Sequence, residues 1–502
     1  MGDLFSNLYF GFSVSLAPHN LLACFMGVFV GTAIGVLPGL GPVATMSLLL
    51  PITIKMEPTA AIIIMAGVFY GAMYGGSTTS ILLNLPGEAS SVVTTLDGYQ
   101  MARQGRAGPA LAICAWGSFI AGTLGVLGIT LMAPALAEMA VKIGPPELVA
   151  LLCLSFLLVV QFSGGSRPRA AASALLGFLL STVGLDPVES TPRYDFGTFT
   201  LMDGVGFAPL VIGLFGISEV LINLEKSEKM EVFQGRIKGL WPTRQDWRDS
   251  APAIGRGSIV GFFMGILPGM GTIVPPFLSY SLERRISRKP EKFGTGVIEG
   301  VAGPEAANNS ATAGSMIPLL TLGIAPSAAV AVLTAAFLTH GVQPGPLLIT
   351  EHPAIFWGVV TSMYTGNALL LLLNLPLVGM WARLLTVPYR YLWPMILLFC
   401  GVGAYSVSNN PVDVLLMAVF GLLGYMMRKL NYPGAPLVLA FVLGRLFEEK
   451  VRQSLVISRG SYETFIAHPL ALLAWIASAI LLLYPFFMRG KSAPHFPPEE
   501  EE

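Results

Sequence analysis

Long runs of apolar residues alternate with short polar stretches along the whole chain. The clearest runs exceed the length of about 18 residues with which a helix can cross a bilayer. They cover residues 110–136, 205–223, 354–378 and 466–488. Because such runs recur from end to end, the pattern predicts an all-α polytopic membrane protein with about 10 to 12 transmembrane helices.

One short phrase occurs twice inside these apolar runs. Residues 31–42 read GTAIGVLPGLGP and residues 261–272 read GFFMGILPGMGT. A Pro-Gly-x-Gly sequence cannot continue an α-helix, since proline lacks a donor and glycine favours turns. Lipid tolerates such a break only where protein or water receives the freed backbone groups. Two breaks at matching places favour a secondary transporter with broken or re-entrant helices in two inverted repeats, although a simple kink is the alternative.

Weaker matches extend the repeat beyond this phrase. QGRAGPAL at 104–111 resembles GVQPGPLL at 341–348, and the APLV at 208–211 recurs at 435–438. We therefore expect four parts, namely a first membrane repeat (1–224), a cytoplasmic linker (225–252), a second membrane repeat (253–450), and an extra C-terminal helix with a tail (451–502).

The distribution of basic residues predicts how the repeats are oriented. Lys and Arg collect on cytoplasmic loops, and the linker carries Lys226, Lys229, Arg236, Lys238, Arg244 and Arg248. The loop at 283–292 is strongly basic, whereas its counterpart at 53–58 offers only Lys55. Because a basic loop in one half faces a poorly charged loop in the other, the two halves are expected to lie in opposite membrane orientations.

Two polar segments lie between apolar spans, at residues 74–91 and 303–329. Hydroxyls, amides and helix N-termini can together bind a small anion, and Ser, Thr or Asn oxygens with unwound carbonyls suit a hard cation. Close helix packing by small residues is the alternative. The candidate substrate- or ion-binding residues are Pro38, Gly39, Gly41, Ser77, Thr78, Thr79, Asn84, Pro268, Gly269, Gly271, Asn308, Asn309, Ser310 and Thr312.

Three acidic residues lie close to these polar segments, namely Glu88, Glu299 and Glu305. A carboxylate inside a membrane is a functional candidate by default, but at a helix end it can instead be solvated among headgroups. Glu305 is the strongest of the three and is our candidate for ion coupling. For Asp97, in the segment TLDGYQMARQG, a structural role in a loop is favoured.

Composition removes several other classes. With 29 basic and 29 acidic residues the formal net charge is zero, so no nucleic-acid partner is indicated. The four cysteines are scattered singly without metal-ligand spacing. Neither a GxxxxGK[ST] phosphate loop nor an HExxH motif occurs in the sequence. We expect no catalytic residues, no metal and no organic cofactor.

At its polar motifs the chain resembles the large membrane permease subunit of the tripartite tricarboxylate transporter family, TctA. The resemblance rests on GVLPGLGP (35–42), YGGSTTSILLNLPGE (74–88), LDGYQMARQGRAGPAL (96–111), GVAGPEAANNSATAGSMIPLLTLG (300–323) and HGVQPGPLL (340–348). One segment departs from the family pattern. Where the family commonly has LGIPGS, this chain has LGIAPS at Leu322–Ser327, which bears on substrate choice and gating.

This resemblance implies a multi-pass permease of the bacterial inner membrane. It implies two partners, a small membrane subunit and a periplasmic solute-binding protein. It further implies uptake of carboxylates such as citrate, driven by a gradient of a coupling cation, either sodium or the proton. The alternatives are a stand-alone cation–carboxylate symporter without a binding protein, an intramembrane enzyme that uses Glu305 and the Asn pair, and a passive channel.

Overall fold

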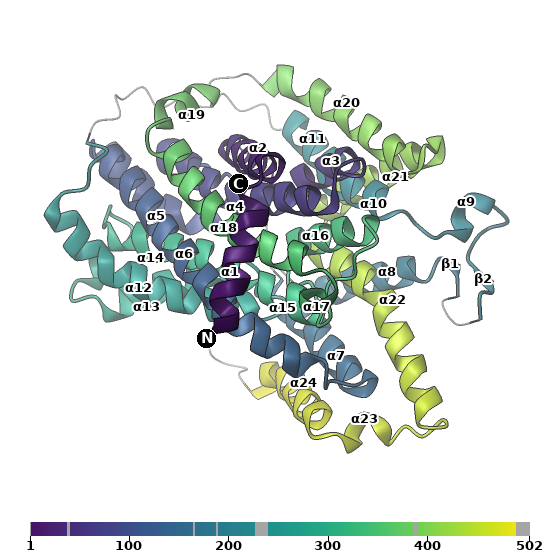
Figure 1. Ribbon diagram of the computed structural model, residues 1–502. Coiled ribbons are helices and arrows are strands. Elements are labelled where there is room, and N and C mark those ends of the chain that lie inside the picture. Colours follow the sequence, from purple (N-terminus) through teal and green to yellow (C-terminus); the bar gives the residue numbers. More distant parts are fainter. Residues whose placement is uncertain are drawn as a thin grey trace.

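The computed structural model describes residues 2–37, 41–163, 166–186, 189–225, 239–385 and 389–487, and these residues are mainly helical (Figure 1). The elements up to residue 225 are α1 (Gly2–Ser15), α2 (Pro18–Val36), α3 (Pro42–Thr53), α4 (Pro58–Leu83), the 3-10 helix η1 (Ala89–Ser91), α5 (Val92–Arg103), α6 (Ala107–Ala140), α7 (Pro145–Phe162), α8 (Arg167–Ser181), β1 (Gly184–Leu185), β2 (Pro192–Arg193), α9 (Phe199–Met202), α10 (Phe207–Val211), the π-helical η2 (Ile212–Ile217) and α11 (Ser218–Glu225).

The elements after residue 239 are also helices. They are α12 (Arg244–Ile266), α13 (Val274–Ile286), the 3-10 helix η3 (Pro290–Lys292), α14 (Glu299–Gly314), α15 (Met316–Leu322), α16 (Ala328–Thr339), α17 (Leu348–Glu351), α18 (Pro353–Asn374), α19 (Val378–Leu384), α20 (Tyr389–Ser408), α21 (Pro411–Lys429), α22 (Gly434–Ile457), α23 (Thr464–Ala467) and α24 (Pro469–Phe487). The two short strands pair antiparallel, with Gly184 opposite Arg193.

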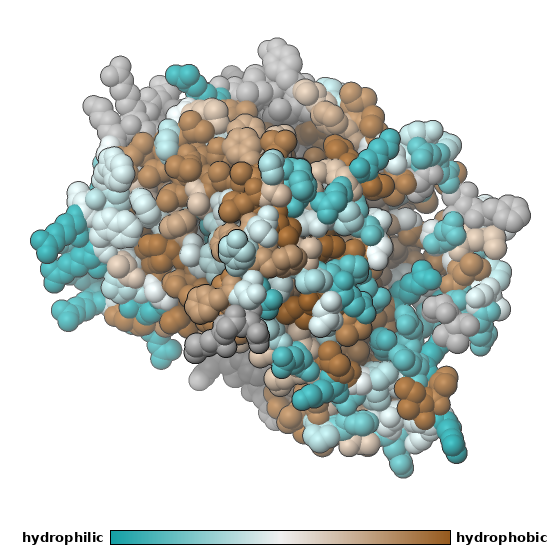
Figure 2. All heavy atoms as spheres, viewed as in Figure 1, coloured by the Kyte–Doolittle hydropathy of each residue, from teal (hydrophilic) through white to brown (hydrophobic). Residues whose placement is uncertain are grey.

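The hydrophobic helices confirm the predicted class, an all-α polytopic membrane protein. Among the described residues, seven helices are long and apolar enough to cross a membrane, and four shorter apolar helices accompany them. Large apolar side chains remain exposed on outer helices, for example Leu398 on α20 and Leu473 on α24, each 64% exposed. Figure 2 shows apolar side chains over much of the viewed face, while polar ones gather at its left edge and lower right. The total of 10 to 12 spans and the inverted arrangement stay predictions.

The most extensive helix pair of the first half joins α2 to α4. Glycines of α2 lie directly on the backbone of α4, because a Cβ added at Gly31 would lie 2.5 Å from the carbonyl oxygen of Val68, and one added at Gly35 would lie 2.3 Å from that of Ala72. Contacts below 3.0 Å leave no room for a side chain. Small residues are what allow two membrane helices to approach so closely.

The corresponding pair of the second half joins α12 to α14 in the same way. A Cβ added at Gly261 would lie 2.2 Å from the carbonyl oxygen of Ala307, and one added at Gly265 would lie 2.3 Å from that of Ala311. Gly261 and Gly265 are the residues that match Gly31 and Gly35 in the repeated phrase. The sequence duplication therefore has a structural counterpart, which is a helix pair built twice on matching glycines.

Asp97 on α5 ties the first half to the loop before α14. Its buried carboxylate accepts hydrogen bonds from the backbone N–H groups of Gly294 at 3.0 Å, Gly296 at 2.7 Å and Val297 at 2.9 Å. The hydroxyl of Tyr280 on α13 donates a further hydrogen bond at 2.9 Å. A carboxylate held by so many donors fixes the loop at 294–297, so the contacts are structural as the sequence favoured. Asp97 itself lies within α5 and not in a loop, so that part of the prediction is wrong.

Within the stretch 225–252, α12 begins at Arg244, and residues 226–238 lie outside the described residues. Thr243 and Asp246 form a reciprocal cap at the start of this helix. Asp246 also accepts a hydrogen bond from the Arg106 guanidinium at 2.9 Å. Burial opposes ionisation of Asp246, but the hydrogen bonds from Thr243 and the charge of Arg106 outweigh it and lower the pKa of this carboxyl. This contact joins the start of α12, within the predicted linker, to Arg106 of the first repeat.

Candidate functional site

The first part of the polar segment at 74–91 forms the last turns of α4 and lies in the protein interior. Ser77, Thr78 and Thr79 are each at most 5% exposed. The helix continues to Leu83 without interruption and ends at Asn84, which has a left-handed backbone with φ of 59°. Asn84 is exposed and lies outside the buried polar region. Of the predicted residues on this segment, the three hydroxyl residues therefore reach the interior and Asn84 does not.

Glu305 lies at the junction of the two halves. Its side chain is on α14 and only 1% exposed. The hydroxyl of Ser77 on α4 donates to Glu305 Oε2 at 2.5 Å, and the hydroxyl of Thr94 on α5 donates to Glu305 Oε1. Residues more than 200 positions apart in the chain thus meet at one carboxylate. This places the acidic residue that the sequence singled out at a contact between the two predicted repeats.

Asn308 follows Glu305 by one helical turn and contacts a second acid. Its Nδ2 donates to Glu88 Oε1 at 3.3 Å, and Glu88 Oε2 accepts from the backbone N–H of Ser90 at 3.3 Å and from the Ser90 hydroxyl. Asn308 is fully buried, and its Oδ1 has no hydrogen-bond partner among the described residues. We call Ser77, Glu88, Thr94, Glu305 and Asn308 the carboxyl cluster.

The other predicted polar residues of α14 hold this helix in place. Asn309 Nδ2 donates to the hydroxyl of Ser118 on α6 at 2.7 Å. The Ser310 hydroxyl donates to the carbonyl of Ser258 on α12 at 2.7 Å. The hydroxyl of Thr312 donates to the carbonyl of Asn308 in its own helix at 2.9 Å. Asn309 and Ser310 therefore tie α14 to α6 and α12, whereas the hydrogen bond of Thr312 stays within its own helix.

At the first break, the structure describes the residues on either side. Pro38 and Gly39 lie outside the described residues. Helix α2 ends at Val36, whose carbonyl accepts a hydrogen bond from Thr79 at 2.5 Å. Gly41 begins α3 as its N-terminal cap residue. The carbonyl of Val36 has no partner within its own helix, because α2 ends there. The Thr79 hydroxyl donates to it instead, as a helix break inside a membrane requires.

The second break is a tight turn after α12 that starts at Pro268. Gly269 and Gly271 both have positive φ, +83° and +54°, which favours glycine over any residue with a Cβ. The backbone N–H of Gly269 donates to the carbonyl of Pro326 at 3.0 Å. Pro326 belongs to the LGIAPS segment, in which the chain departs from the expected LGIPGS. The departure therefore lies directly against the second break.

Sequence reasoning gave Glu88 less weight than the structure does, and it did not select Thr94 or Ser118. Thr94 lies one helical turn before Asp97 on the buried face of α5. A buried threonine at helical spacing from a buried aspartate is a signal that the sequence carries. No local pattern indicates the pairing of Asn308 with Glu88, because it brings a residue of α14 against the turn between α4 and η1, 220 positions away in the chain.

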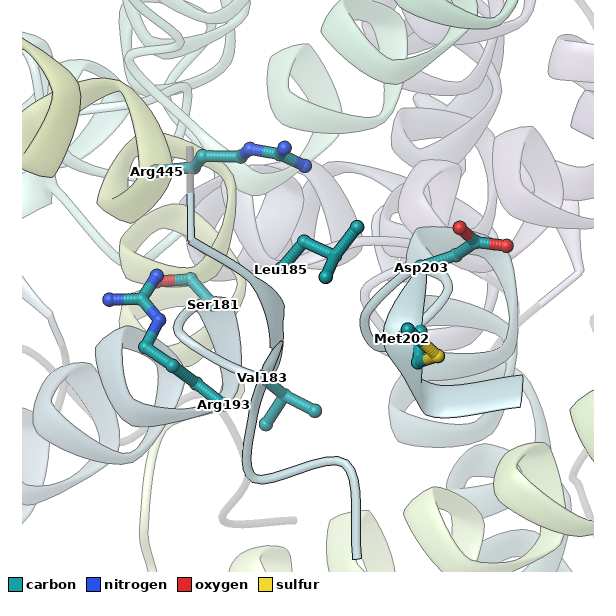
Figure 3. Close-up of a pocket in the computed structure, with 7 residues that line it drawn as sticks. All are labelled: Ser181, Val183, Leu185, Arg193, Met202, Asp203 and Arg445. Carbon is teal, nitrogen blue, oxygen red and sulfur yellow. The ribbon is translucent and has the colours of Figure 1, made fainter. Parts of the chain in front are cut away.

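A separate pocket lies beside the β1–β2 hairpin, away from the carboxyl cluster, with a cavity volume of about 130 Å³ (Figure 3). Arg193 and Arg445 are among its lining residues. Arg193 pairs with Glu448 on α22 at 2.7 Å, and hydrogen bonding to Glu448 raises its pKa. Because different elements form it, this pocket is not part of the predicted site. Its ion pairs fix the hairpin to α22.

The fold and the site define a polytopic helical membrane protein whose two halves meet at buried polar groups. A family model, described as the tripartite tricarboxylate transporter TctA family, matches residues 21–439. The chain therefore belongs to this transporter family, as the sequence motifs predicted.

Two relatives come from Agrobacterium vitis. An uncharacterized 52.8 kDa protein in the TAR-I ttuC' 3'region is 46% identical over 488 residues, which is 97% of each chain. An uncharacterized protein in the TAR-II ttuC' 3'region is 50% identical over 211 residues, which is 42% of this chain and 87% of the relative. No solved structure matches the chain.

Proposed function

We propose that this chain is the large permease subunit of a binding-protein-dependent secondary transporter, which imports carboxylates such as citrate across the bacterial inner membrane. The observation that carries the proposal is the buried contact of Ser77 with Glu305, made between the two predicted repeats of a chain in a transporter family. A small membrane subunit and a periplasmic binding protein are the proposed partners, since the family is tripartite.

The charges of the site favour separate binding sites for the substrate and for the coupling cation. Glu88 and Glu305 would repel a carboxylate substrate, and they suit a cation. The breaks offer the opposite chemistry. Gly41 is the N-terminal cap residue of α3, and Gly271 turns with positive φ, so backbone N–H groups there can face an anion. We therefore assign the substrate carboxylates to the breaks and the cation to the carboxyl cluster.

Alternating access is the mechanism we propose, with the two repeats moving against each other around this site and the breaks acting as gates. A test uses Leu37→Cys and Leu267→Cys, which lie next to the two breaks. Labelling by a water-soluble maleimide should change in opposite directions at the two positions when substrate and cation are added. Unchanged labelling at both positions in a transporting protein would contradict the mechanism.

The proposed function is tested by uptake into proteoliposomes. The chain is reconstituted with its small membrane subunit, with and without the binding protein, and radiolabelled carboxylates are supplied under a sodium gradient and then a proton gradient. Accumulation that requires the binding protein supports the proposal, whereas accumulation without it favours a stand-alone symporter. Flux that never exceeds equilibrium indicates a channel, and no flux of any carboxylate overturns the assignment of substrate class.

A further inference from the structure

Two carboxyl groups, those of Glu88 and Glu305, are buried in the carboxyl cluster without a counter-charge. Glu88 is 9% exposed and Glu305 is 1% exposed. Asn308, one turn after Glu305 on α14, donates a hydrogen bond to Glu88 at 3.3 Å, so both acids lie beside the same stretch of this helix. Among the described residues, no lysine, arginine or histidine forms an ion pair with either group. Two like charges in a medium of low dielectric constant cannot both persist without a bound cation or proton.

The neighbouring titratable groups do not supply the missing positive charge. Tyr74 on α4 donates its hydroxyl to the carbonyl of Ala115 at 2.7 Å, and the buried thiol of Cys114 on α6 carries no positive charge. On α13, Glu283 pairs with Arg256 of α12 at 2.6 Å. Asp97 on α5 is held by backbone N–H groups and Tyr280. Whatever neutralises Glu88 and Glu305 must therefore enter from outside.

The hydrogen bonds favour a proton over a metal ion. Each oxygen of the two carboxyl groups already accepts a hydrogen bond from a hydroxyl or an N–H group of Ser77, Thr94, Ser90 or Asn308. A metal ion would have to displace these donors. No group of three or more His, Cys, Asp or Glu residues that could hold a metal exists in the part of the chain that the structure describes.

Asn308 supplies an acceptor for the proton. Its Nδ2 donates to Glu88, while its Oδ1 is buried and has no partner among the described residues. A half-turn of this amide would exchange the two atoms. A protonated Glu88 could then donate its O–H to Oδ1, and the unpaired acceptor would be satisfied. The side chain thus fits both protonation states of Glu88, one in each orientation.

We propose that one coupling proton binds in the carboxyl cluster, on Glu88 or Glu305, and that Asn308 rotates its amide when Glu88 takes up that proton. The inference rests on the proposed function and adds to it the identity of the ion and its site. In each cycle a proton from the outside binds a carboxylate oxygen of the pair, giving a neutral carboxyl group, and it leaves the same oxygen toward the cytoplasm. No other bond forms or breaks.

The transport test compares two assays in proteoliposomes. Glu88→Gln and Glu305→Gln should each lower accumulation driven by a proton gradient at least tenfold, while exchange of external for internal substrate stays within about threefold of wild type, because exchange needs no net proton movement. Glu291→Gln, on the exposed 3-10 helix η3, is the control and should behave as wild type. Wild-type accumulation driven by sodium alone, or proton-driven accumulation that survives in both variants, would overturn the proposal.

A second measurement does not depend on transport. In purified protein, infrared difference spectra between acid and neutral pH should show the band of a protonated carboxyl group that Glu88→Gln or Glu305→Gln removes. Asn308→Ala should keep the band and displace its midpoint in pH. A band that is unchanged in all three variants would overturn the proton site. Loss of the band in the variants, together with a wild type that transports no carboxylate, would uphold the site and reject the proposed function.

Discussion

The helix pairs α2–α4 and α12–α14 share one framework but differ in chemistry. Gly35 lies on Ala72 as Gly265 lies on Ala311, so both pairs close at matching positions. In the same register, Glu305 and Asn308 of α14 correspond to Ala66 and Phe69 of α4. One pair therefore presents an acid and an amide where the other presents only apolar groups.

This difference shows how a duplicated membrane framework can carry a single ion site. The glycine contacts depend only on shape, and therefore both halves keep them. The carboxyl cluster needs residues from both halves. Ser77 and Thr94 of the first half donate to Glu305 of the second, and Asn308 of the second half donates to Glu88 of the first. The helix pair is duplicated, but its polar groups differ between the halves. The single carboxyl cluster therefore lies where the two halves meet.

The largest expected effect comes from breaking the shared framework. Gly265→Ala places a Cβ 2.3 Å from the carbonyl oxygen of Ala311, so the helices must separate. Overpacking of this kind costs about 1 to 3 kcal/mol, and Gly35→Ala should cost a similar amount. Thermal unfolding in detergent measures both effects. Gly255→Ala, on α12 with no atom within 4 Å, is the control and should raise stability slightly.

If Gly265→Ala and Gly255→Ala have the same unfolding temperature, α12 does not approach α14 as closely as described. If Gly265→Ala is destabilising and Gly35→Ala is not, the two pairs are not equivalent and the comparison fails.

A smaller loss is expected when the connection between the halves is weakened at Asp97. Asp97→Asn replaces one carboxylate oxygen by an NH₂ group, which cannot accept hydrogen bonds from the loop at 294–297. Because hydrogen bonds to charged groups contribute about 1.5 to 3 kcal/mol, we expect a loss of about 2 kcal/mol. Tyr280→Phe removes one donor and should cost about 1 kcal/mol. Equal unfolding temperatures for Asp97→Asn and wild type would contradict this role.

At the start of α12, Asp246→Asn should destabilise the protein by about 1 kcal/mol at neutral pH, as the loss of a helix cap does. The pKa of Asp246 is lower in the folded protein than its ordinary value of 3.8. Its contribution is therefore complete above that value and is lost as the pH falls through the folded-state pKa. Unfolding temperatures of wild type and variant should converge in acid. A constant difference down to low pH would show that the charge has no role.

The smallest expected effect is the difference in stability between variants of Thr79 and Thr312, two threonines that the sequence analysis lists together as candidates. Thr79→Val leaves the carbonyl of Val36 without its donor and should cost about 1 kcal/mol. Thr312→Val removes only a hydrogen bond within its own helix and should change stability less. The difference between the two unfolding temperatures measures what the hydroxyl at the first break contributes. Equal unfolding temperatures would mean that the hydrogen bond of Thr79 to Val36 contributes no more to stability than one within a helix.

Much of the fold could be predicted because it follows from local physics. Apolar runs predict helices in lipid, and Pro-Gly-x-Gly predicts breaks, as the ends of α2 at Val36 and α12 at Ile266 bear out. The polar segments also predicted a buried site near Ser77 and Glu305. Paired contacts could not be predicted. The meeting of Glu88 with Asn308, and the exposure of Asn84 on the same segment, depend on helix rotation and register, on which composition and spacing carry no information.

The most direct test of the account uses Cys114, which is buried on α6 one turn before Ser118, the residue that Asn309 of α14 contacts. A variant that keeps only this cysteine is reconstituted and labelled with a small water-soluble maleimide. The account predicts that adding substrate and a proton gradient changes the labelling rate at Cys114. A matched variant that keeps only Cys24, which is buried against Tyr70 at 3.7 Å, should not respond. Labelling at Cys114 that is the same in every condition, in a protein that accumulates substrate, would contradict the central claim that the carboxyl cluster lies on the transport route.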